Sequence, residues 1–226
     1  MKTITSLIIL ILMAFSSFSQ NPNDALIVLS PGIANIKEIK PKPAKTKGSY
    51  YYNTNWSVGT VKFFSGDIIE NYPLKYDMRM NQVDIKVDNQ VKATSASAVK
   101  EIVWINEKGF TEILRNALLF SKDQTGFFSI LVDGKRPLLK KTTLRLQEAN
   151  YNPALDVGSR AKKYVKNESY FTILNGELKK INKSKRKILK CFDNKTGIIK
   201  EYVSKNKLNY KNDYDLVKIF EYYNSL

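Results

Sequence analysis

The chain has 226 residues, with 37 Lys and Arg against 21 Asp and Glu, so its formal net charge is +16. It contains no histidine and one cysteine, which excludes Ser-His-Asp and Cys-His catalysis, the usual zinc ligand sets and an internal disulfide. We therefore expect no cofactor and no transition metal. Only six basic residues are Arg, whereas nucleic-acid recognition favours the planar fork of Arg. Nucleic acid is not an expected partner.

The first nineteen residues follow the pattern of a secretory signal peptide. Lys2 supplies a positive charge, and residues 7–15 form an uninterrupted apolar run. Ser17 and Ser19 are the small residues expected before cleavage at Gln20. The apolar stretch is shorter than the about 20 residues that a spanning helix requires. We predict export through the secretory route to the periplasm or the extracellular space, with no transmembrane span in the mature chain.

The segment 20–47 is predicted to be an extended leader. Pro41 and Pro43 prevent a helix, and the neighbouring Lys residues repel each other. We therefore expect 37–47 to be a tether. The apolar patch 25–29 is a candidate edge strand, because five apolar residues follow one another there.

From residue 48 to 182 the pattern changes to short β-type runs separated by turns. The expected strands cover 50–52, 56–64, 74–80, 83–87, 90–94, 99–105, 110–114, 126–132, the stretch from 135 that includes Leu144 and Leu146, 164–174 and 178–181. Asp133-Gly134 suits a type I′ turn, and Asn175-Gly176 separates the last two strands. Strands joined by tight turns predict an antiparallel meander of barrel-like or sandwich form.

The apolar spacing changes to a helical period at Ser184 and keeps it to the C-terminus. Ser184 and Asp213 are expected N-caps, and Cys191 is expected to be a small core residue. The apolar faces of the last two helices are expected to include Ile199, Tyr202, Leu216, Phe220 and Tyr223. The predicted fold class is α+β: an antiparallel β domain over 48–182, with C-terminal helices over 183–226 packed on it.

Several stretches between residue 47 and the C-terminus carry a family resemblance. They are residues 47–49, 56–61, 72–77, 126–141, 151–158, 199–207 and 222–224. In these stretches the chain resembles an uncharacterised family of exported proteins of Bacteroidota. The resemblance covers nearly everything from Gly48 to the C-terminus. It implies export and a single structural unit, and it implies no activity, ligand or site.

Two groups of charged residues are candidate binding sites. Lys75, Asp77 and Arg79 alternate along one face of a predicted strand and can hold an anionic or polar ligand, although solvated strands also carry alternating charge. The segment 179–190 has seven basic residues in twelve. Its central basic residues are Lys183, Lys185, Arg186 and Lys187. Such a cluster beside an amphipathic helix either binds an anionic membrane or polyanion, or is a solvated basic face.

The leading functional hypothesis is a non-catalytic binding or envelope-associated protein. Its basic surface would contact an anionic envelope surface, a polysaccharide or a protein. One alternative is a hydrolase that uses a carboxylate pair. The acids considered for such a pair are Asp67, Asp77, Asp84, Glu101, Glu107 and Glu112. A second alternative is a subunit of an envelope complex, with the patch 25–29 as a contact. A deep cleft with two close carboxylates would favour the hydrolase, and a flat basic face would favour binding.

Overall fold

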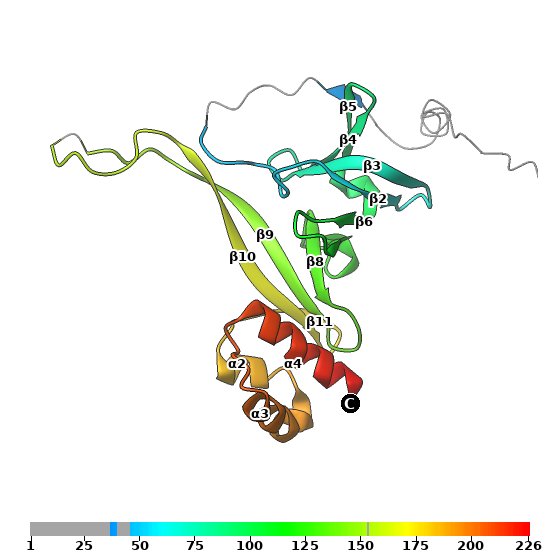
Figure 1. Cartoon of the computed structure of the whole chain (residues 1–226), viewed down its shortest axis with the longest axis vertical. Helices are drawn as coiled ribbons and strands as arrows, with labels where there is room; N and C mark the ends of the chain where they lie inside the picture. Colours follow the sequence, from blue (N-terminus) through cyan, green and yellow to red (C-terminus); the bar gives the residue numbers. More distant parts are fainter. Residues whose placement is uncertain (1–36, 40–45, 153) are drawn as a thin grey trace, which may run out of the picture.

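A computed structural model describes residues 37–39, 46–152 and 154–226. The predictions for the signal peptide, the patch 25–29 and most of the tether lie outside the described residues. One antiparallel sheet and a compact group of short helices make up the part that is described (Figure 1). The predicted α+β class, with an antiparallel meander before a small helical region, is confirmed.

The strands precede the α-helices along the chain. The strands are β1 (Lys37–Ile39), β2 (Ser57–Phe63), β3 (Ile68–Asp77), β4 (Gln82–Val87), β5 (Gln90–Ser95), β6 (Val99–Ile105), β7 (Thr111–Asn116), β8 (Phe127–Val132), β9 (Leu138–Gln147), β10 (Lys163–Leu174) and β11 (Glu177–Ile181). The helices are α2 (Lys185–Leu189), α3 (Thr196–Lys205) and α4 (Asp213–Ser225), with 3₁₀ turns η1 (Ala96–Ala98), η2 (Ala117–Leu119) and η3 (Asp193–Lys195).

Two meanders lie side by side in the sheet, whose strand order is β1-β5-β4-β3-β2-β6-β7-β8-β9-β10-β11. β2 pairs with β3 on one side and with β6 on the other. The sheet is open, because β1 and β11 are edges of the described strands. β1 belongs to the expected tether, and its three residues pair with β5.

The sheet must curl, because η1 joins β5 to β6 directly. In a flat sheet these strands would lie four spacings apart, about 19 Å. The chain from Ser95 to Val99 spans at most about 14 Å when fully extended. The curl brings β5 close to β6 and encloses the first core between the strands.

The first core is built from side chains of β2, β3, β4, β6, β7 and β8, together with Ala96 of η1. Its buried members are Val61, Phe63, Ile69, Leu74, Tyr76, Val83, Ile85, Val87, Ala96, Val99, Ile102, Trp104, Leu114 and Phe127. Burial of each large side chain contributes about 1.5–3 kcal/mol. Gly59 is needed where β2 passes Trp104, because a Cβ there would lie 2.3 Å from the Val103 carbonyl oxygen and 2.7 Å from the Trp104 Cβ.

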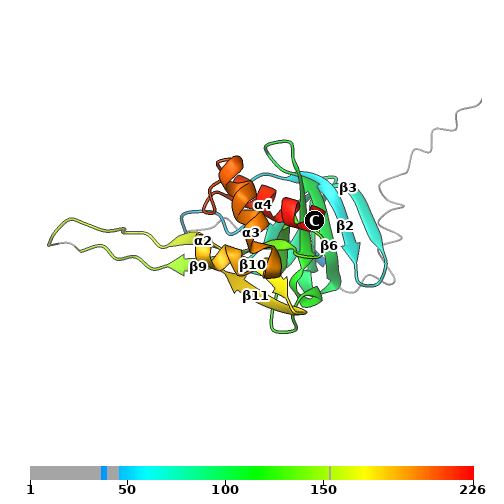
Figure 2. The same cartoon turned by 90° about the horizontal axis from the view of Figure 1, so that it is seen from below.

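The second core joins the three helices to the β8–β11 end of the sheet (Figure 2). Its buried members are Val132, Leu138, Tyr170, Ile181, Ile188, Leu189, Cys191, Phe192, Ile199, Val203, Leu216, Ile219, Phe220 and Tyr223. The core position predicted for Cys191 is confirmed. Ser184 precedes α2 as predicted. The N-cap prediction for Asp213 is wrong by one residue: Asn212 is the N-cap of α4, and its side chain accepts a hydrogen bond from the Asp215 N–H.

The two predicted hairpin turns have different outcomes. Asn175 and Gly176 have φ of +52° and +78° and directly link β10 to β11, as a type I′ turn requires. The type I′ prediction for Asp133-Gly134 is wrong, because β8 and β9 are joined by the five residues 133–137 and only Gly134 has positive φ. Asn224 in α4 binds this loop through both ends of its side-chain amide.

Candidate functional site

The helical module, residues 183–226, is rich in positive charge. It contains eleven Lys and Arg residues against five Asp and Glu residues. This excess of six in 44 residues is about twice the charge density of the whole chain, which carries +16 in 226 residues. A surface that keeps this surplus unpaired attracts anions over about a Debye length.

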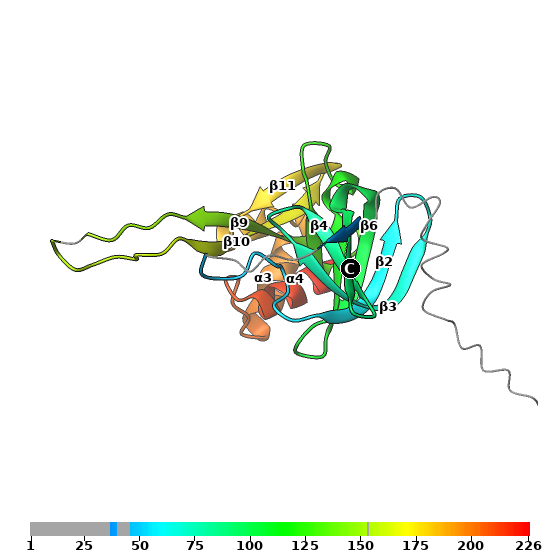
Figure 3. The same ribbon diagram turned by 90° about the horizontal axis from the view of Figure 1, so that it is seen from above.

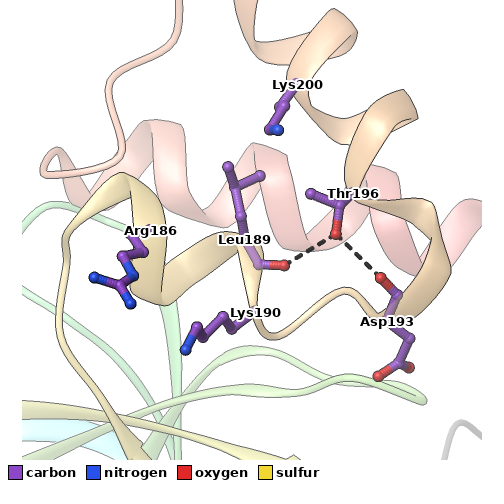
Figure 4. A pocket seen from close by; sticks show the side chains of 6 residues that line it. All are labelled: Arg186, Leu189, Lys190, Asp193, Thr196 and Lys200. Carbon is purple, nitrogen blue, oxygen red and sulfur yellow. Dashed lines mark hydrogen bonds between the residues drawn. The ribbon is translucent and has the colours of Figure 1, made fainter.

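A pocket of about 400 Å³ lies in this module between α2 and α3. Its lining residues are Arg186, Leu189, Lys190, Asp193, Thr196 and Lys200 (Figure 4). Three of the six are cationic, and Leu189 lies in the centre of the group in Figure 4. The volume is within the range of small-ligand sites, about 300–1,000 Å³.

A sharp change of chain direction between the helices forms the pocket. α2 ends at Leu189, η3 turns the chain, and α3 begins at Thr196. The Thr196 hydroxyl donates to the carbonyl oxygens of Leu189, at 3.3 Å, and Asp193, at 3.0 Å. These bonds hold the end of α2 against the start of α3. Leu189 of α2 and Ile199 of α3 are buried in the second core and anchor the two helices there.

The one acidic lining residue, Asp193, is already paired. Its Oδ2 accepts hydrogen bonds from the Arg136 Nη2, at 2.5 Å, and the Tyr223 hydroxyl, at 3.2 Å. Arg136 is buried, with 6 % of its surface exposed, and it also donates to the Ile173 carbonyl oxygen at 2.6 Å. Arg136 therefore neutralises the Asp193 carboxylate from the sheet side.

The three cations of the pocket have no such neutralising partner. Within the described ranges, no Asp or Glu oxygen lies within 4.0 Å of the charged nitrogens of Arg186, Lys190 or Lys200. All three residues are exposed. The pocket thus combines three solvent-facing positive charges with an acid that is already neutralised, which favours a bound anion.

The structure divides the basic group predicted around α2. Arg186 lines the pocket, and Lys185 and Lys187 are exposed on the same helix outside the pocket lining. Lys183 forms an ion pair away from the pocket, because its Nζ is 2.6 Å from Asp213 Oδ1 at the start of α4. Lys200 was not predicted, because it lies outside the basic segment and only the turn at η3 brings it to the pocket.

Asp213 is held by the sheet as well as by Lys183. The Tyr170 hydroxyl donates to its Oδ2 at 2.5 Å. Burial opposes ionisation of Asp213, but the hydrogen bonds from Lys183 and Tyr170 outweigh burial and lower its pKa. Tyr170 therefore fastens the start of α4 to β10, and Lys183 ties it to the segment between β11 and α2.

The second predicted group, Lys75, Asp77 and Arg79, lies at the β3–β4 turn. Asp77 is 2 % exposed, and its Oδ1 accepts the N–H groups of Arg79, at 2.8 Å, and Met80, at 2.9 Å. Its carboxylate therefore shapes the turn. The Arg79 guanidinium lies 4.2 Å from the centroid of the Tyr50 ring. Asp77 and Arg79 therefore lie together in the β3–β4 turn, where the Arg79 guanidinium packs on Tyr50.

Lys75 faces Asp84 across the β3–β4 ladder. Its Nζ lies 4.8 Å from the Tyr51 ring centroid and 5.3 Å from that of Trp56. Burial lowers the pKa of Lys75. Asp84 is fully buried and accepts hydrogen bonds from Tyr51 Oη and Gln82 Nε2, both at 2.9 Å. Burial raises the pKa of Asp84, and these hydrogen bonds offset part of the rise.

The other acids considered for a hydrolytic pair are distributed over separate contacts. Glu101 binds Lys62 and Arg115. Glu112 accepts from the hydroxyl of Tyr52, at 2.5 Å, and from the indole N–H of Trp104, at 3.2 Å. Asp67 binds Ser65, and Glu107 binds Asn55. None of the six acids lines the pocket between α2 and α3.

In comparisons with known proteins, no family model, no curated protein and no solved structure matches this chain. A search of the described segments found no helix with the length and apolar character needed to cross a membrane.

Proposed function

We propose that this protein is exported and acts as a non-catalytic binding protein, which holds an anionic partner in the pocket between α2 and α3. One observation carries the proposal: Arg186, Lys190 and Lys200 surround a single pocket of about 400 Å³, and no acidic side chain of the described residues pairs with them. The signal-peptide pattern and the positive net charge support the same reading.

The chemistry of the lining residues indicates the kind of group that binds. Arg186 offers a planar guanidinium that can donate two parallel hydrogen bonds to a carboxylate, sulfate or phosphate. Lys190 and Lys200 add compact charges. The open, exposed arrangement suits a charged group that projects from a larger partner, such as a uronic-acid carboxylate of an envelope polysaccharide. Because the cations are exposed, binding must weaken as salt screens them.

A soluble acidic polysaccharide tests the proposal without the complication of a membrane. We expect the chain to bind alginate at low salt and not to bind neutral dextran. The combined variant Arg186→Gln, Lys190→Gln, Lys200→Gln should bind alginate about tenfold to a hundredfold more weakly, since each engaged charge contributes up to about 1 kcal/mol.

The matched control removes the same number of charges from the same module outside the pocket. Lys205, Lys207 and Lys211 are all exposed, so the triple Gln variant at these positions should retain most of the affinity. Equal losses in the two variants would mean that diffuse charge, and not the pocket, holds the polysaccharide. No binding by the wild-type chain at low salt would overturn the proposal.

Export is tested separately by the intact mass of the protein recovered from outside the cytoplasm. We expect a chain that begins at Gln20, because Ser17 and Ser19 provide the small residues that the peptidase requires. A retained Met1 would contradict export by cleavage.

A further inference from the structure

β9 and β10 continue past the rest of the sheet as a two-stranded ribbon (Figures 1 and 3). β8 pairs only with residues 138–140 of β9, and β11 pairs only with residues 170–174 of β10. The β9–β10 ladder nevertheless extends to the pair Gln147 and Lys163. Lys47 forms a parallel bridge with Lys163 at the end of this ladder. The hairpin beyond this bridge projects from the body and carries its tip away from the helices (Figure 1).

The tip has an ordered hydrogen-bond pattern of its own. The N–H groups of Asn150 and Asn152 donate to the carbonyl oxygens of Ser159, at 3.0 Å, and Val157, at 2.9 Å. Gly158 has φ of +95°, and a Cβ there would lie 2.4 Å from the Asn150 carbonyl oxygen, so glycine is required. These contacts shape the tip before any partner arrives, which lowers the entropic cost of binding.

Side chains reinforce this shape. The Tyr151 hydroxyl donates to Asp156 Oδ1 at 2.8 Å. The Arg160 guanidinium stacks on the Tyr151 ring, 4.0 Å from its centroid, and its Nη2 lies 3.5 Å from Asp156 Oδ1. Tyr151, Asp156 and Arg160 thus satisfy one another and leave the apolar residues of the tip to face solvent.

Those apolar residues are Leu155 and Val157. Leu155 is 69 % exposed and Val157 is 55 % exposed. Leu155 is the most exposed large hydrophobic residue in the described part of the chain. Neither belongs to a hydrophobic core. An ordered tip that presents two apolar side chains far from the body is a contact element.

Positive charge surrounds the base of the tip. The segment 145–166 contains five basic and two acidic residues. Both acids are paired, Glu148 with Lys162 at 2.7 Å and Asp156 with Arg160. Among the described residues, no acid lies within ion-pair distance of the remaining basic residues, Arg145, Lys163 and Lys166, and the Lys166 Nζ donates to the Tyr52 carbonyl oxygen at 2.9 Å.

We infer that the tip is a membrane-contact element for an anionic lipid surface: Leu155 and Val157 enter the interface, and the basic residues behind them contact the headgroups. Apolar residues backed by Lys and Arg are the arrangement that binds such interfaces. A protein partner fits less well, because a stable protein interface buries about 800 Å² on each side and this narrow tip offers two apolar side chains. The inference does not depend on the pocket between α2 and α3.

Vesicle binding tests the inference with the full mature chain. We expect co-sedimentation with vesicles of equimolar phosphatidylcholine and phosphatidylglycerol, and much less with phosphatidylcholine alone. Leu155→Asp should weaken binding at least about tenfold, because a charged group replaces one that enters the apolar layer. Val157→Asp should act in the same direction. The matched control is Val58→Asp, since Val58 is 54 % exposed on β2 in the body of the protein.

Tryptophan fluorescence tests directly whether the tip enters the membrane interface. In Leu155→Trp, emission should shift to shorter wavelength when phosphatidylglycerol vesicles are added, whereas Val58→Trp should show no shift. An unchanged Leu155→Asp affinity, or no emission shift at position 155, would overturn the inference. Vesicle binding that is lost only in the pocket variant of Arg186, Lys190 and Lys200 would also overturn it, and would leave the proposed function intact.

Discussion

Arg136 in the β8–β9 loop and Asp193 at the start of η3 form the ion pair that joins the sheet to the helical module. The guanidinium is buried and 2.5 Å from the carboxylate, and its Cζ lies 5.6 Å from the Tyr223 ring centroid. The same pair sets the charge of the pocket, because it neutralises the one acid in its lining. The Arg136–Asp193 contact therefore contributes both to docking of the helices and to the positive character of the pocket.

Removal of Arg136 should loosen the module. We expect Arg136→Met to lower the free energy of unfolding by about 2 kcal/mol, because Asp193 and the Ile173 carbonyl oxygen lose their donors. Chemical denaturation followed by circular dichroism measures the change. Arg145→Met, at an exposed position on β9, should change stability by less than about 0.5 kcal/mol. Equal effects of the two substitutions would show that the ion pair does not fasten the module.

The apolar face of α4 should dominate the stability of the second core. Phe220 is fully buried, and its ring centroid lies 5.0 Å from that of Phe192. Phe220→Ala should lower stability by about 3–5 kcal/mol through lost burial and a cavity. Lys218→Ala on the same helix should cost about 0.5 kcal/mol or less, as measured by thermal melting. A small, similar effect of both changes would mean that α4 is not docked.

Asp84 gives stability a pH dependence of known sign. Its folded-state pKa is raised by burial above the ordinary value of 3.8, so ionisation disfavours the folded state. The free-energy cost of ionising Asp84 in the folded state is absent below pH 3.8, the ordinary pKa. It grows as the pH rises from there to the folded-state pKa and stays constant above it. Asp84→Asn cannot ionise and should gain stability relative to the wild type across that window. Urea denaturation over a pH series measures this difference, and a difference that is constant with pH would contradict it.

Lys141 should stand apart from the other lysines. Its Nζ lies 4.8 Å from the Phe128 ring centroid and donates to the Thr125 carbonyl oxygen. Burial lowers the pKa of Lys141 to about 8. NMR titration of isotope-labelled, reductively methylated protein should show one lysine with a midpoint near pH 8, and Lys141→Arg should remove that signal. A persistent signal in the variant would assign the midpoint to another residue.

The elements that could be predicted from the sequence are those whose signal is local. The buried apolar positions Val83, Ile85 and Val87 of β4 and the helical spacing of Leu216, Phe220 and Tyr223 follow from periods of two and 3.6 residues, which short stretches of chain reveal, whereas the burial of Asp84 does not follow from that alternation. The two glycine-containing turns show the limit of such signals. Asn175-Gly176 turns as its own residues dictate, whereas the loop after β8 is held by Asn224, which is 88 residues from Arg136 in the chain.

The candidate site depends on contacts that no local pattern contains. The basic run around Arg186 could be recognised, but Lys200 reaches the pocket only through the turn at η3. Lys183 belongs to the same run and is held by Asp213, thirty residues away. Charge clustering indicated the region, and tertiary contacts decided which of its residues face the pocket.

Amide NMR during titration with alginate shows whether the anion occupies the pocket between α2 and α3, because it locates the bound anion on the protein. We expect the shifted resonances to cluster from Arg186 to Lys200, at the end of α2, in η3 and in the first turn of α3, and we expect added salt to reverse the shifts. Shifts spread evenly over the basic surface, or concentrated on the sheet, would contradict it.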